Sequence, residues 1–233
     1  MTELQFVNLG LTAYQPTWEL QQKIFNLRVD QKISDVFLLT EHNHVYTLGK
    51  SSEEAHLLAD ENELKSANAE VYHIDRGGDI TYHGPGQLVG YPIVDLNNYY
   101  PDTHRYLRDL EEVLIRTLKD FDINGHREEN YTGVWVGSDK IAAIGVKVSR
   151  WVTMHGFALN VNTNLSYFDR IIPCGIFHKG VTSMQKILGN GVPFDNVIKS
   201  VSSRFGEVFG THTVTLEKDE FLAKINQITS EKI

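Results

Sequence analysis

The sequence holds a single cysteine, Cys174, among 233 residues. An intramolecular disulfide is therefore excluded, as is any zinc site built from several cysteines, and the composition fits a reducing compartment. No basic segment followed by an apolar run opens the sequence, so we expect no secretory signal peptide. The longest apolar runs, such as residues 36–39, are far shorter than the roughly 20 residues that span a bilayer. These absences predict a cytoplasmic protein with no membrane partner.

Positive charge and nucleotide-binding motifs are also scarce. The formal net charge is −8, which argues against general binding of nucleic acid or anionic membrane. Residues 49–51 read Gly-Lys-Ser, but His44 occupies the position where a phosphate-binding loop needs its first glycine. No Gly-x-Gly-x-x-Gly motif precedes a helix, and the ten histidines lack the spacing of a metal site. We therefore expect no cofactor, no metal and no nucleic-acid partner.

Hydrophobic spacing predicts both helices and strands. The expected helices are residues 17–31, 60–68, 103–120, 194–209 and 218–228. The expected strands are residues 4–8, 35–42, 44–49 (paired with or continuing the strand before it), 70–75, 87–96, the antiparallel meander 132–136, 140–148 and 151–161, and 211–216. Pro92 suggests an edge strand or a bulge. These runs indicate an α+β fold with a mixed, largely antiparallel sheet packed with helices. We expect one catalytic domain over residues 1–233, with about 193–233 as a candidate small C-terminal helical appendage.

The densest functional signal is the segment of residues 76–87, which reads RGGDITYHGPGQ. Its four glycines let the backbone approach a ligand closely and adopt positive φ angles. The Arg, Asp, Thr, Tyr, His and Gln side chains add hydrogen-bonding groups along the same segment. A solvated turn does not need that set of residues, so the segment indicates a binding loop.

Cys174 and Lys140 form the candidate chemical pair. Cys174 lies between a rigid proline and a glycine without a side chain, which favours an accessible thiol; the alternative is a small buried hydrophobe. A thiol has a pKa of about 8.5, so it needs a positive neighbour to ionise at pH 7. Lys140, at the start of an apolar strand, could supply that charge; the alternative is a solvated lysine. Lys147 is expected on the opposite face of the strand, because an odd separation reverses the side.

Two histidines are candidates for binding a substrate carbonyl or transferring a proton. His83 lies within the glycine-rich segment, where it could equally tie the loop to the sheet. His155 faces the same choice, and there we favour the structural role.

Together these residues resemble the octanoyl-[acyl-carrier-protein]:protein N-octanoyltransferases, also called lipoyl/octanoyl transferases. That family's signature is Arg-Gly-Gly, Asp or Glu, any residue, Thr, an aromatic residue, His, two free positions, Gly or His, and Gln, and residues 76–87 satisfy every specified position. HGFALNVNTNL at 155–165 resembles the family's central strand, and IIPCG at 171–175 its nucleophile loop. The resemblance covers roughly residues 35–190.

The resemblance implies a biotin/lipoate protein ligase-like catalytic domain that acts as a monomer without a cofactor. It would transfer an octanoyl group from octanoyl-acyl carrier protein to a lysine of lipoyl domains, those of 2-oxoacid dehydrogenase E2 subunits and of the glycine cleavage H protein. Cys174 would carry the acyl group as a thioester, and Lys140 would lower the pKa of Cys174 or help deprotonate the acceptor amine. The implied substrate-binding residues are Arg76, Gly77, Gly78, Asp79, Ile80, Thr81, Tyr82, His83, Ala143, Ile144, Gly145, Gly156, Phe157 and Ala158.

An eight-carbon acyl group calls for an apolar tunnel, whose wall the small residues of 142–158 suit, although small residues also ease strand packing. Two acidic partner proteins predict a local basic surface, with Lys147, Arg150 and Lys179 as candidates. Three other interpretations stay open: an ATP-dependent lipoate or biotin ligase on the same fold, a hydrolase or amidase using Cys174 and His83, and a non-catalytic acyl-binding module.

Overall fold

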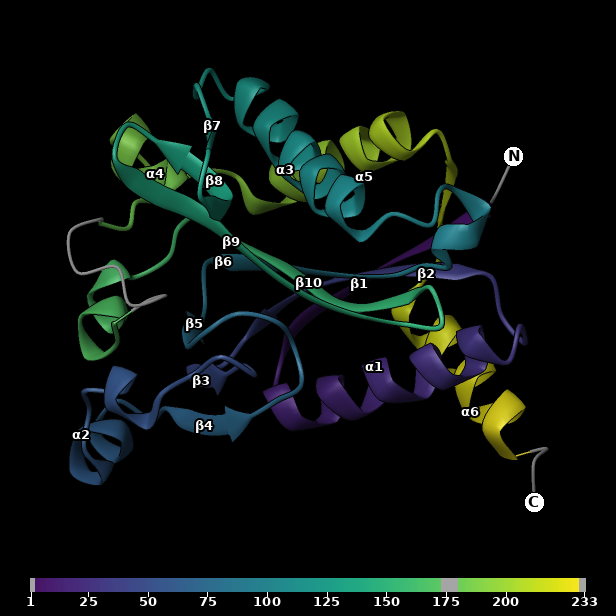
Figure 1. The fold of residues 1–233 in the computed structure, drawn as a ribbon, viewed down its shortest axis with the longest axis horizontal. Coiled ribbons are helices and arrows are strands. Elements are labelled where there is room, and N and C mark those ends of the chain that lie inside the picture. Colours follow the sequence, from purple (N-terminus) through teal and green to yellow (C-terminus); the bar gives the residue numbers. More distant parts are fainter. Residues whose placement is uncertain (1–2, 173–179, 231–233) are drawn as a thin grey trace.

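An eight-stranded mixed sheet crosses the molecule (Figure 1). The computed structural model describes residues 3–172 and 180–230. The strands of this sheet are β1 (Glu3–Thr12), β2 (Asp35–His42), β6 (Gln87–Ile93), β7 (His126–Glu128), β8 (Tyr131–Val136), β9 (Asp139–Ser149), β10 (Val152–Asn160) and β11 (His212–Thr215). Their order is β11-β1-β2-β6-β10-β9-β8-β7. Only β1 pairs in parallel, with β2 and β11, which confirms the predicted mixed, largely antiparallel sheet and its meander β8-β9-β10.

A second sheet of three strands carries the glycine-rich segment. Its strands are β3 (Val45–Leu48), β4 (Glu70–His73) and β5 (Thr81–His83), in the order β4-β3-β5. The expectation that residues 35–42 and 44–49 form a strand pair or one bent strand is wrong, because β2 pairs with β1 and β6 whereas β3 pairs with β4 and β5. The link from β4 to β5 therefore runs beneath the main sheet, and this link contains the first residues of the motif.

Helices cover both faces of the main sheet, with α3 and α5 on one face and α1 and α6 on the other (Figure 1). The helices are α1 (Tyr14–Val29), α2 (Glu61–Ser66), α3 (Thr103–Lys119), α4 (Met184–Leu188), α5 (Phe194–Phe209) and α6 (Lys218–Ser230), with 3₁₀ helices η1 (Glu54–His56), η2 (Leu96–Asn98) and η3 (Leu165–Arg170). As the helical spacing predicts, α3 buries Leu110, Leu114 and Leu118. None of the helices in the described ranges is both long and apolar enough to cross a membrane.

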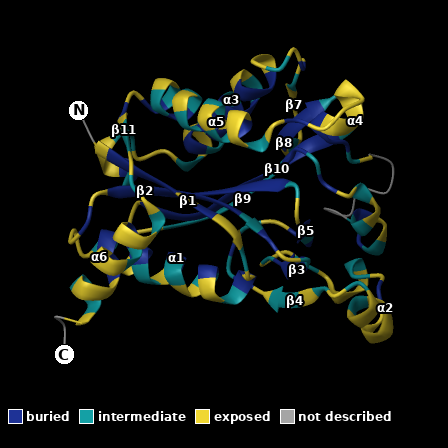
Figure 2. Cartoon of the chain, turned by 180° about the vertical axis from the view of Figure 1, so that it is seen from behind, coloured by how far each residue is buried: buried dark blue, intermediate teal, exposed yellow. Residues whose placement is uncertain are grey.

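The sheet separates two layers of buried side chains, and the outward faces of the helices are exposed (Figure 2). On the α3 and α5 side, Phe37 packs against Phe205 with ring centroids 4.6 Å apart. On the α1 and α6 side, Ile24 and Phe221 belong to one apolar cluster. Within the range expected as a candidate appendage, α5 contributes to the first layer, α6 to the second, and β11 pairs with β1.

Pro92 lies in an interior strand, because β6 has β2 on one side and β10 on the other. The expected edge position is therefore wrong. The irregularity lies in the neighbouring strand instead: pairing of β10 with β6 runs only as far as Phe157 and Gly90, and His155 of β10 has a positive φ of 60°. Pro92 therefore lies beyond the last hydrogen-bonded pair of β6 and β10, where its missing N–H leaves no gap in the pairing of these two strands.

Candidate active site

A cavity of about 470 Å³ lies between the main sheet and the link from β4 to β5. Strands β6, β9 and β10 contribute its sheet side. Its wall contains Lys140 and every implied substrate-binding residue except Tyr82. Cys174 lies outside the described residues. One concave site therefore gathers the glycine-rich segment and two strands of the meander, which are distant in the sequence.

Alternation along β5 separates Tyr82 from the cavity. Thr81 and His83 border the cavity, and the residue between them points to the opposite side of the strand. The Tyr82 ring is fully buried in a separate apolar cluster, and its hydroxyl lies 2.8 Å from Nδ1 of His44. Tyr82 therefore packs beneath the motif and supports it from behind.

The motif loop is fastened to the sheet through backbone groups. The Gly77 N–H donates to the carbonyl of Val146 at 2.9 Å. The guanidinium of Arg76 donates to the carbonyl of Thr47 at 2.7 Å and to that of Gly77 at 3.1 Å. A Cβ atom at Gly145 would lie 2.8 Å from the Gly77 carbonyl oxygen, so this close approach requires glycine. The glycines thus let the loop approach the strand, and Arg76 stiffens the loop by holding backbone carbonyls.

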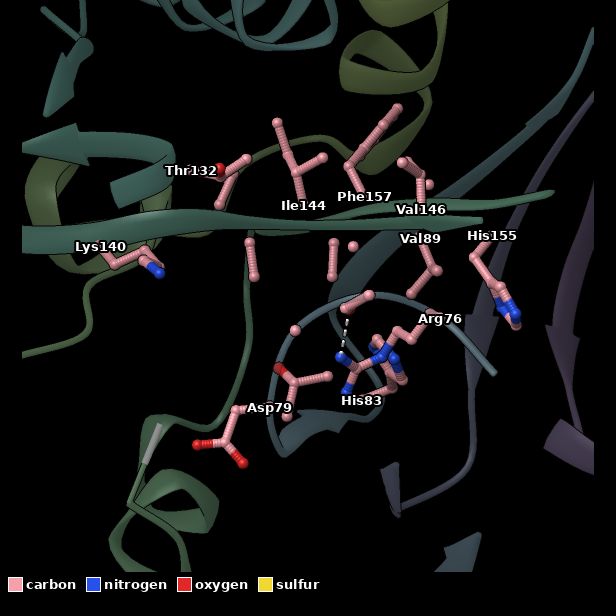
Figure 3. Close-up of a pocket in the computed structure, with 18 of the residues that line it drawn as sticks. Arg76, Asp79, His83, Val89, Thr132, Lys140, Ile144, Val146, His155 and Phe157 are labelled. Atoms are coloured by element: carbon pink, nitrogen blue, oxygen red, sulfur yellow. Dashed lines mark hydrogen bonds between the residues drawn. The ribbon is translucent and has the colours of Figure 1, made fainter. Parts of the chain in front are cut away.

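Small residues form part of the sheet side of the cavity. Four of them come from neighbouring positions of the paired strands β9 and β10: Ala143, Gly145, Gly156 and Ala158. Ile144 and Phe157 also border the cavity, but their side chains point to the other side of the strand from Arg76 and Asp79 (Figure 3). The lined space therefore extends to both sides of β9.

Lys140 is buried at one end of this cavity, with only 8% of its surface exposed. Its Nζ lies 4.8 Å from the centre of the Trp135 ring, and a Cβ at Gly133 would lie 3.4 Å from its Cε. Its backbone N–H donates to the Gly180 carbonyl at 2.9 Å, and its carbonyl accepts from the Thr182 N–H at 3.0 Å. Lys140 therefore also holds the chain that directly follows residues 173–179.

A bulge in β9 places Lys140 and Lys147 on the same side of the sheet. Between the pairs Trp135–Lys140 and Val134–Ala142, β9 contains one residue more than β8. The extra residue resets the alternation of side chains, so both ammonium groups lie on the side of the motif loop. The expectation of opposite faces is wrong for this reason.

The chain before residues 173–179 is held by η1. The Ile172 N–H donates to the carbonyl of His56 at 2.9 Å, and the Leu58 N–H donates to the carbonyl of Arg170 at 2.8 Å. The described residues that flank 173–179 are therefore held by His56, which bonds Ile172, and by Lys140, which bonds Gly180. Both of these anchors adjoin the same end of the cavity, since His56 contacts the cavity residue Asp79.

A hydrogen-bond chain fixes the ring of His83. Its Nδ1 lies 2.8 Å from the Gln87 amide oxygen, and the Gln87 amide nitrogen donates to the Asn160 side-chain oxygen at 2.9 Å. The Asn160 amide nitrogen donates in turn to the Thr182 carbonyl at 3.0 Å. Because each amide is oriented by its neighbour, Nδ1 of His83 carries the hydrogen. Burial, together with the smaller effect of nearby His42, lowers the pKa of His83 to about 3, so His83 is neutral at pH 7.

Aromatic rings surround His83 at the inner end of the cavity. Tyr14 stacks on the His83 ring with centroids 6.2 Å apart. His42 lies 6.0 Å from His83, and its Nε2 is 2.7 Å from the Tyr91 hydroxyl. Burial lowers the pKa of His42 to about 4 and raises the pKa of the Tyr91 phenol well above its usual value. The histidines and tyrosines at this end of the cavity are therefore neutral at neutral pH, and the guanidinium of Arg76 supplies a positive charge near them.

Asp75 joins the start of the motif loop to the meander. Its carboxylate lies 2.9 Å from Nε2 of His155 and 2.5 Å from Nζ of Lys147. The hydrogen bond from His155, followed by that from Lys147, holds the pKa of Asp75 well below its usual range. His155 thus has the structural contact expected of it, and Lys147 is engaged in an ion pair. Arg150 lies at the turn between β9 and β10, ten residues along from Lys140, and Lys179 lies outside the described residues.

Several residues at this site were not singled out from the sequence, among them Tyr14, His42, His56, Tyr91 and Asn160. None of them has a local signal, because each reaches the site only through the pairing of distant strands or the packing of a helix. The single available hint was that Asn160 lies in the block that resembles the family's central strand.

Several known proteins are similar in sequence to this chain over most of its length. The family described as "Lipoyl protein ligase A/B catalytic domain" matches residues 13–206. The octanoyltransferase of Rubrobacter xylanophilus is 54% identical over 203 residues, which cover 86% of this chain and 91% of the relative. That of Caldicellulosiruptor bescii is 49% identical over 214 residues, with coverage of 91% and 94%.

Solved structures share the fold at low sequence identity. A bi-partite lipoate protein ligase from Thermoplasma acidophilum has a TM-score of 0.73 at 16% identity, with 96% of this chain and 91% of that chain covered. The biotin protein ligase of Aquifex aeolicus has a TM-score of 0.51 at 13% identity, with coverage of 90% and 70%. These likenesses confirm the predicted biotin/lipoate protein ligase-like fold. With the family matched over most of the sequence and with octanoyltransferases among its relatives, the chain belongs to the lipoyl protein ligase A/B catalytic domain family and is an acyltransferase.

Proposed function

We propose that this enzyme transfers an octanoyl group from octanoyl-acyl carrier protein to a lysine of lipoyl domains, through a thioester on Cys174. The observation that carries the proposal is the position of Lys140. Its side chain lies at one end of a cavity walled by small residues, and its backbone holds Gly180 and Thr182, just beyond the segment with Cys174. A buried ammonium group beside that segment suits the stabilisation of a thiolate.

In the first step, the Cys174 thiolate attacks the carbonyl carbon of the donor thioester. A new carbon–sulfur bond forms, the old one breaks, and the carrier leaves as a thiolate. One thioester replaces another, so the exchange needs no ATP. About seven carbons of the acyl chain enter the cavity, and at roughly 0.8 kcal/mol per buried methylene their burial contributes about 5–6 kcal/mol.

In the second step, the lysine of the acceptor domain attacks the acyl-enzyme. Splitting the transfer in two means that the donor and the acceptor proteins never have to bind together. The proposed acceptors are lipoyl domains of 2-oxoacid dehydrogenase E2 subunits and the glycine cleavage H protein. We further propose that the enzyme works as a monomer in the cytoplasm, in keeping with its single cysteine.

Intact-protein mass spectrometry after incubation with octanoyl-acyl carrier protein tests the proposal. The expected result is a gain of one octanoyl group on the enzyme, absent from Cys174→Ser and discharged when an apo lipoyl domain is added. If Cys174→Ser still carried the acyl group, or still modified the lipoyl domain, the thioester route would be rejected.

The ligase interpretation is tested in the same assay with other substrates. Related folds include a lipoate-protein ligase A bound with ATP. Incubation with ATP, free octanoate and apo lipoyl domain should give no modified domain if the proposal holds. Free octanoate as the main product from the carrier donor, even with acceptor present, would instead favour the hydrolase interpretation.

A further inference from the structure

A buried carboxylate of α3 reaches the first strand of the meander. Glu111 is fully buried, although α3 exposes charged residues on its outward face. Its Oε1 atom accepts the Gly133 N–H at 3.0 Å. Glu111 lies one helical turn beyond Leu107, which borders the cavity, so the two side chains lie on the same face of α3. The carboxylate therefore joins this helix to β8 beside the cavity.

Two arginines balance the charge of this carboxylate. Arg108 Nη1 donates to the Glu111 Oε2 atom at 2.8 Å, and Arg127 Nε donates to the same oxygen at 3.1 Å. One carboxylate oxygen therefore binds guanidinium groups, and the other binds the backbone of Gly133. A buried ion pair seldom stabilises a fold more than apolar side chains of the same volume would. The presence of a carboxylate here is therefore better explained by the N–H group that it holds.

Gly133 is the point at which β8 meets the side chain of Lys140. Its φ is 135°, and a Cβ there would lie 2.7 Å from the Ala142 carbonyl oxygen, so the position requires glycine. The same Cβ would lie 3.4 Å from Cε of Lys140, which is ordinary van der Waals contact. The lysine side chain therefore passes close over the backbone of Gly133, and a shift of this backbone would change the space that the lysine occupies.

The strand pairing alone holds this stretch of β8 weakly. The register of β8 on β9 shifts between Val134 and Trp135, and a ladder is locally disrupted at such a bulge. The two contacts of the lysine side chain lie on either side of the shift: Gly133 before it, and the Trp135 ring, 4.8 Å from Nζ of Lys140, after it. The bond from Glu111 therefore adds a fixed point where the ladder is irregular.

We propose that Glu111 is a positioning residue: by holding Gly133, it sets where the ammonium group of Lys140 lies in the cavity. This inference rests on the proposed function, which gives Lys140 its task. Without the carboxylate, the Gly133 N–H loses its acceptor, and an unpaired buried donor is costly. The strand then moves toward another acceptor, and the contact behind the lysine moves with it. A misplacement of about 1 Å can slow a reaction by roughly 10²-fold.

The first test reads the place of Lys140 without using acyl transfer. Native protein and Glu111→Leu each receive a short pulse of an amine-acetylating reagent, and peptide mass spectrometry measures acetylation of Lys140. We expect Lys140 to react several-fold faster in the variant, because its side chain is buried in the native protein and loses a fixed contact. An unchanged labelling rate would overturn the inference.

Glu112→Leu is the matched control. Glu112 is the next residue of α3 and also bonds Arg127, at 2.7 Å, but the Gly133 N–H donates to Glu111 instead. We therefore expect native labelling of Lys140 in this variant. Equal acceleration in the two variants would show that any lost acid of α3 loosens the lysine, and would reject a special role for Glu111.

The second test is a double-mutant cycle on acylation by a small octanoyl thioester, followed by single-turnover mass spectrometry. Glu111→Leu should slow acylation by about 10–10²-fold in the native background. In a Lys140→Met background the same change should cost no more than about twofold, because a lysine that is absent cannot be misplaced. Equal losses in both backgrounds would mean that Glu111 only supports the fold, and would overturn the inference.

Urea denaturation checks that each variant is folded. If Glu111→Leu does not fold, Glu111→Gln replaces it in both tests. The glutamine keeps the size of the side chain but has one oxygen for three donors, so we expect smaller effects in the same direction. Failure of the proposed function looks different: the native enzyme would gain no octanoyl group, while the labelling of Lys140 would still decide the inference.

Discussion

The two ends of the cavity hold histidines in opposite surroundings. At the inner end, His42 and His83 lie among tyrosine rings, and burial lowers the pKa of both to about 4 and about 3, respectively. At the other end, His56 contacts the carboxylate of Asp79 and faces an exposed glutamate. Burial without an acidic partner disfavours the charged form of a histidine, so these two rings stay neutral where they border the inner end of the cavity. At the end near Lys140, the His56 ring instead has a buried carboxylate 2.6 Å from its Nδ1.

A similar difference in burial separates Lys140 from Lys186, a lysine near the same end of the cavity. Lys140 is buried against an aromatic ring beside the cavity, whereas Lys186, two residues beyond the start of α4, has a side chain that is 59% exposed. A lysine on the surface keeps its hydration, so its charge acts weakly on its neighbours. Three substitutions test this difference between the two ends of the cavity.

The largest effect is expected from Lys140→Met. The methionine keeps the apolar contact with Trp135 and removes the charge, so we expect acylation by a small octanoyl thioester to fall by about 10²–10⁴-fold. Single-turnover mass spectrometry measures it. Lys186→Met is the matched control and should stay within a few fold of the native rate; equal losses in the two variants would contradict a special role for the buried lysine.

An intermediate effect is expected from Gly145→Ala in the middle of the cavity. The new methyl group would lie 2.8 Å from the Gly77 carbonyl, so the loop or the strand must move, which costs about 1–3 kcal/mol of unfolding free energy. We also expect a loss of acylation of about tenfold or more. Urea denaturation and the acylation assay measure the two effects.

Gly191→Ala serves as the control for this substitution. A Cβ there meets no atom within 4 Å, and its backbone is not in the positive-φ region. Its unfolding free energy should stay within about 0.5 kcal/mol of the native value. A tolerant Gly145→Ala variant would show that the close approach of the motif loop is not needed.

The smallest effect concerns the pH dependence of stability at the inner end. The pKa of His42 is about 4 when folded, against roughly 6.5 when unfolded, so the unfolded chain binds more protons. The stability due to neutral His42 is complete above pH 6.5 and is lost as the pH falls toward 4. Between pH 7 and pH 5 the loss is on the order of 2 kcal/mol.

His42→Asn should therefore flatten the decline of unfolding free energy over this range, as measured by urea denaturation at several pH values. His212→Asn, at an exposed position, should leave the slope unchanged. An unchanged slope in His42→Asn would contradict a lowered pKa for the buried His42 ring.

Much of the fold could be read from spacing along the chain. The amphipathic periods of α3 and α5 and the meander β8-β9-β10 follow from side-chain patterns that report burial directly. Strand partners could not be read in this way, because pairing depends on residues far away in the sequence. For that reason the sequence predicts β2 and β3 as a strand pair or one bent strand, and it predicts an edge strand or a bulge at Pro92.

In the candidate site, too, local motifs could be predicted from the sequence, whereas contacts between distant residues could not. The glycine-rich motif marked the loop, and the structure places all of its implied contacts except Tyr82 on the cavity. The side on which Lys140 and Lys147 lie depended on a single extra residue in β9, which alternation cannot reveal. His56 had no signal at all, because only tertiary contacts bring it to Asp79 and Ile172.

The sequence by itself determined the chemistry that this protein can offer: one thiol, a glycine-rich loop and lysines in an apolar strand, since these are properties of the residues. The tertiary structure alone decided which groups meet and which of them can hold a charge. It did so because burial and the nearest partner set the free energy of each protonation state, and neither is encoded in the local sequence.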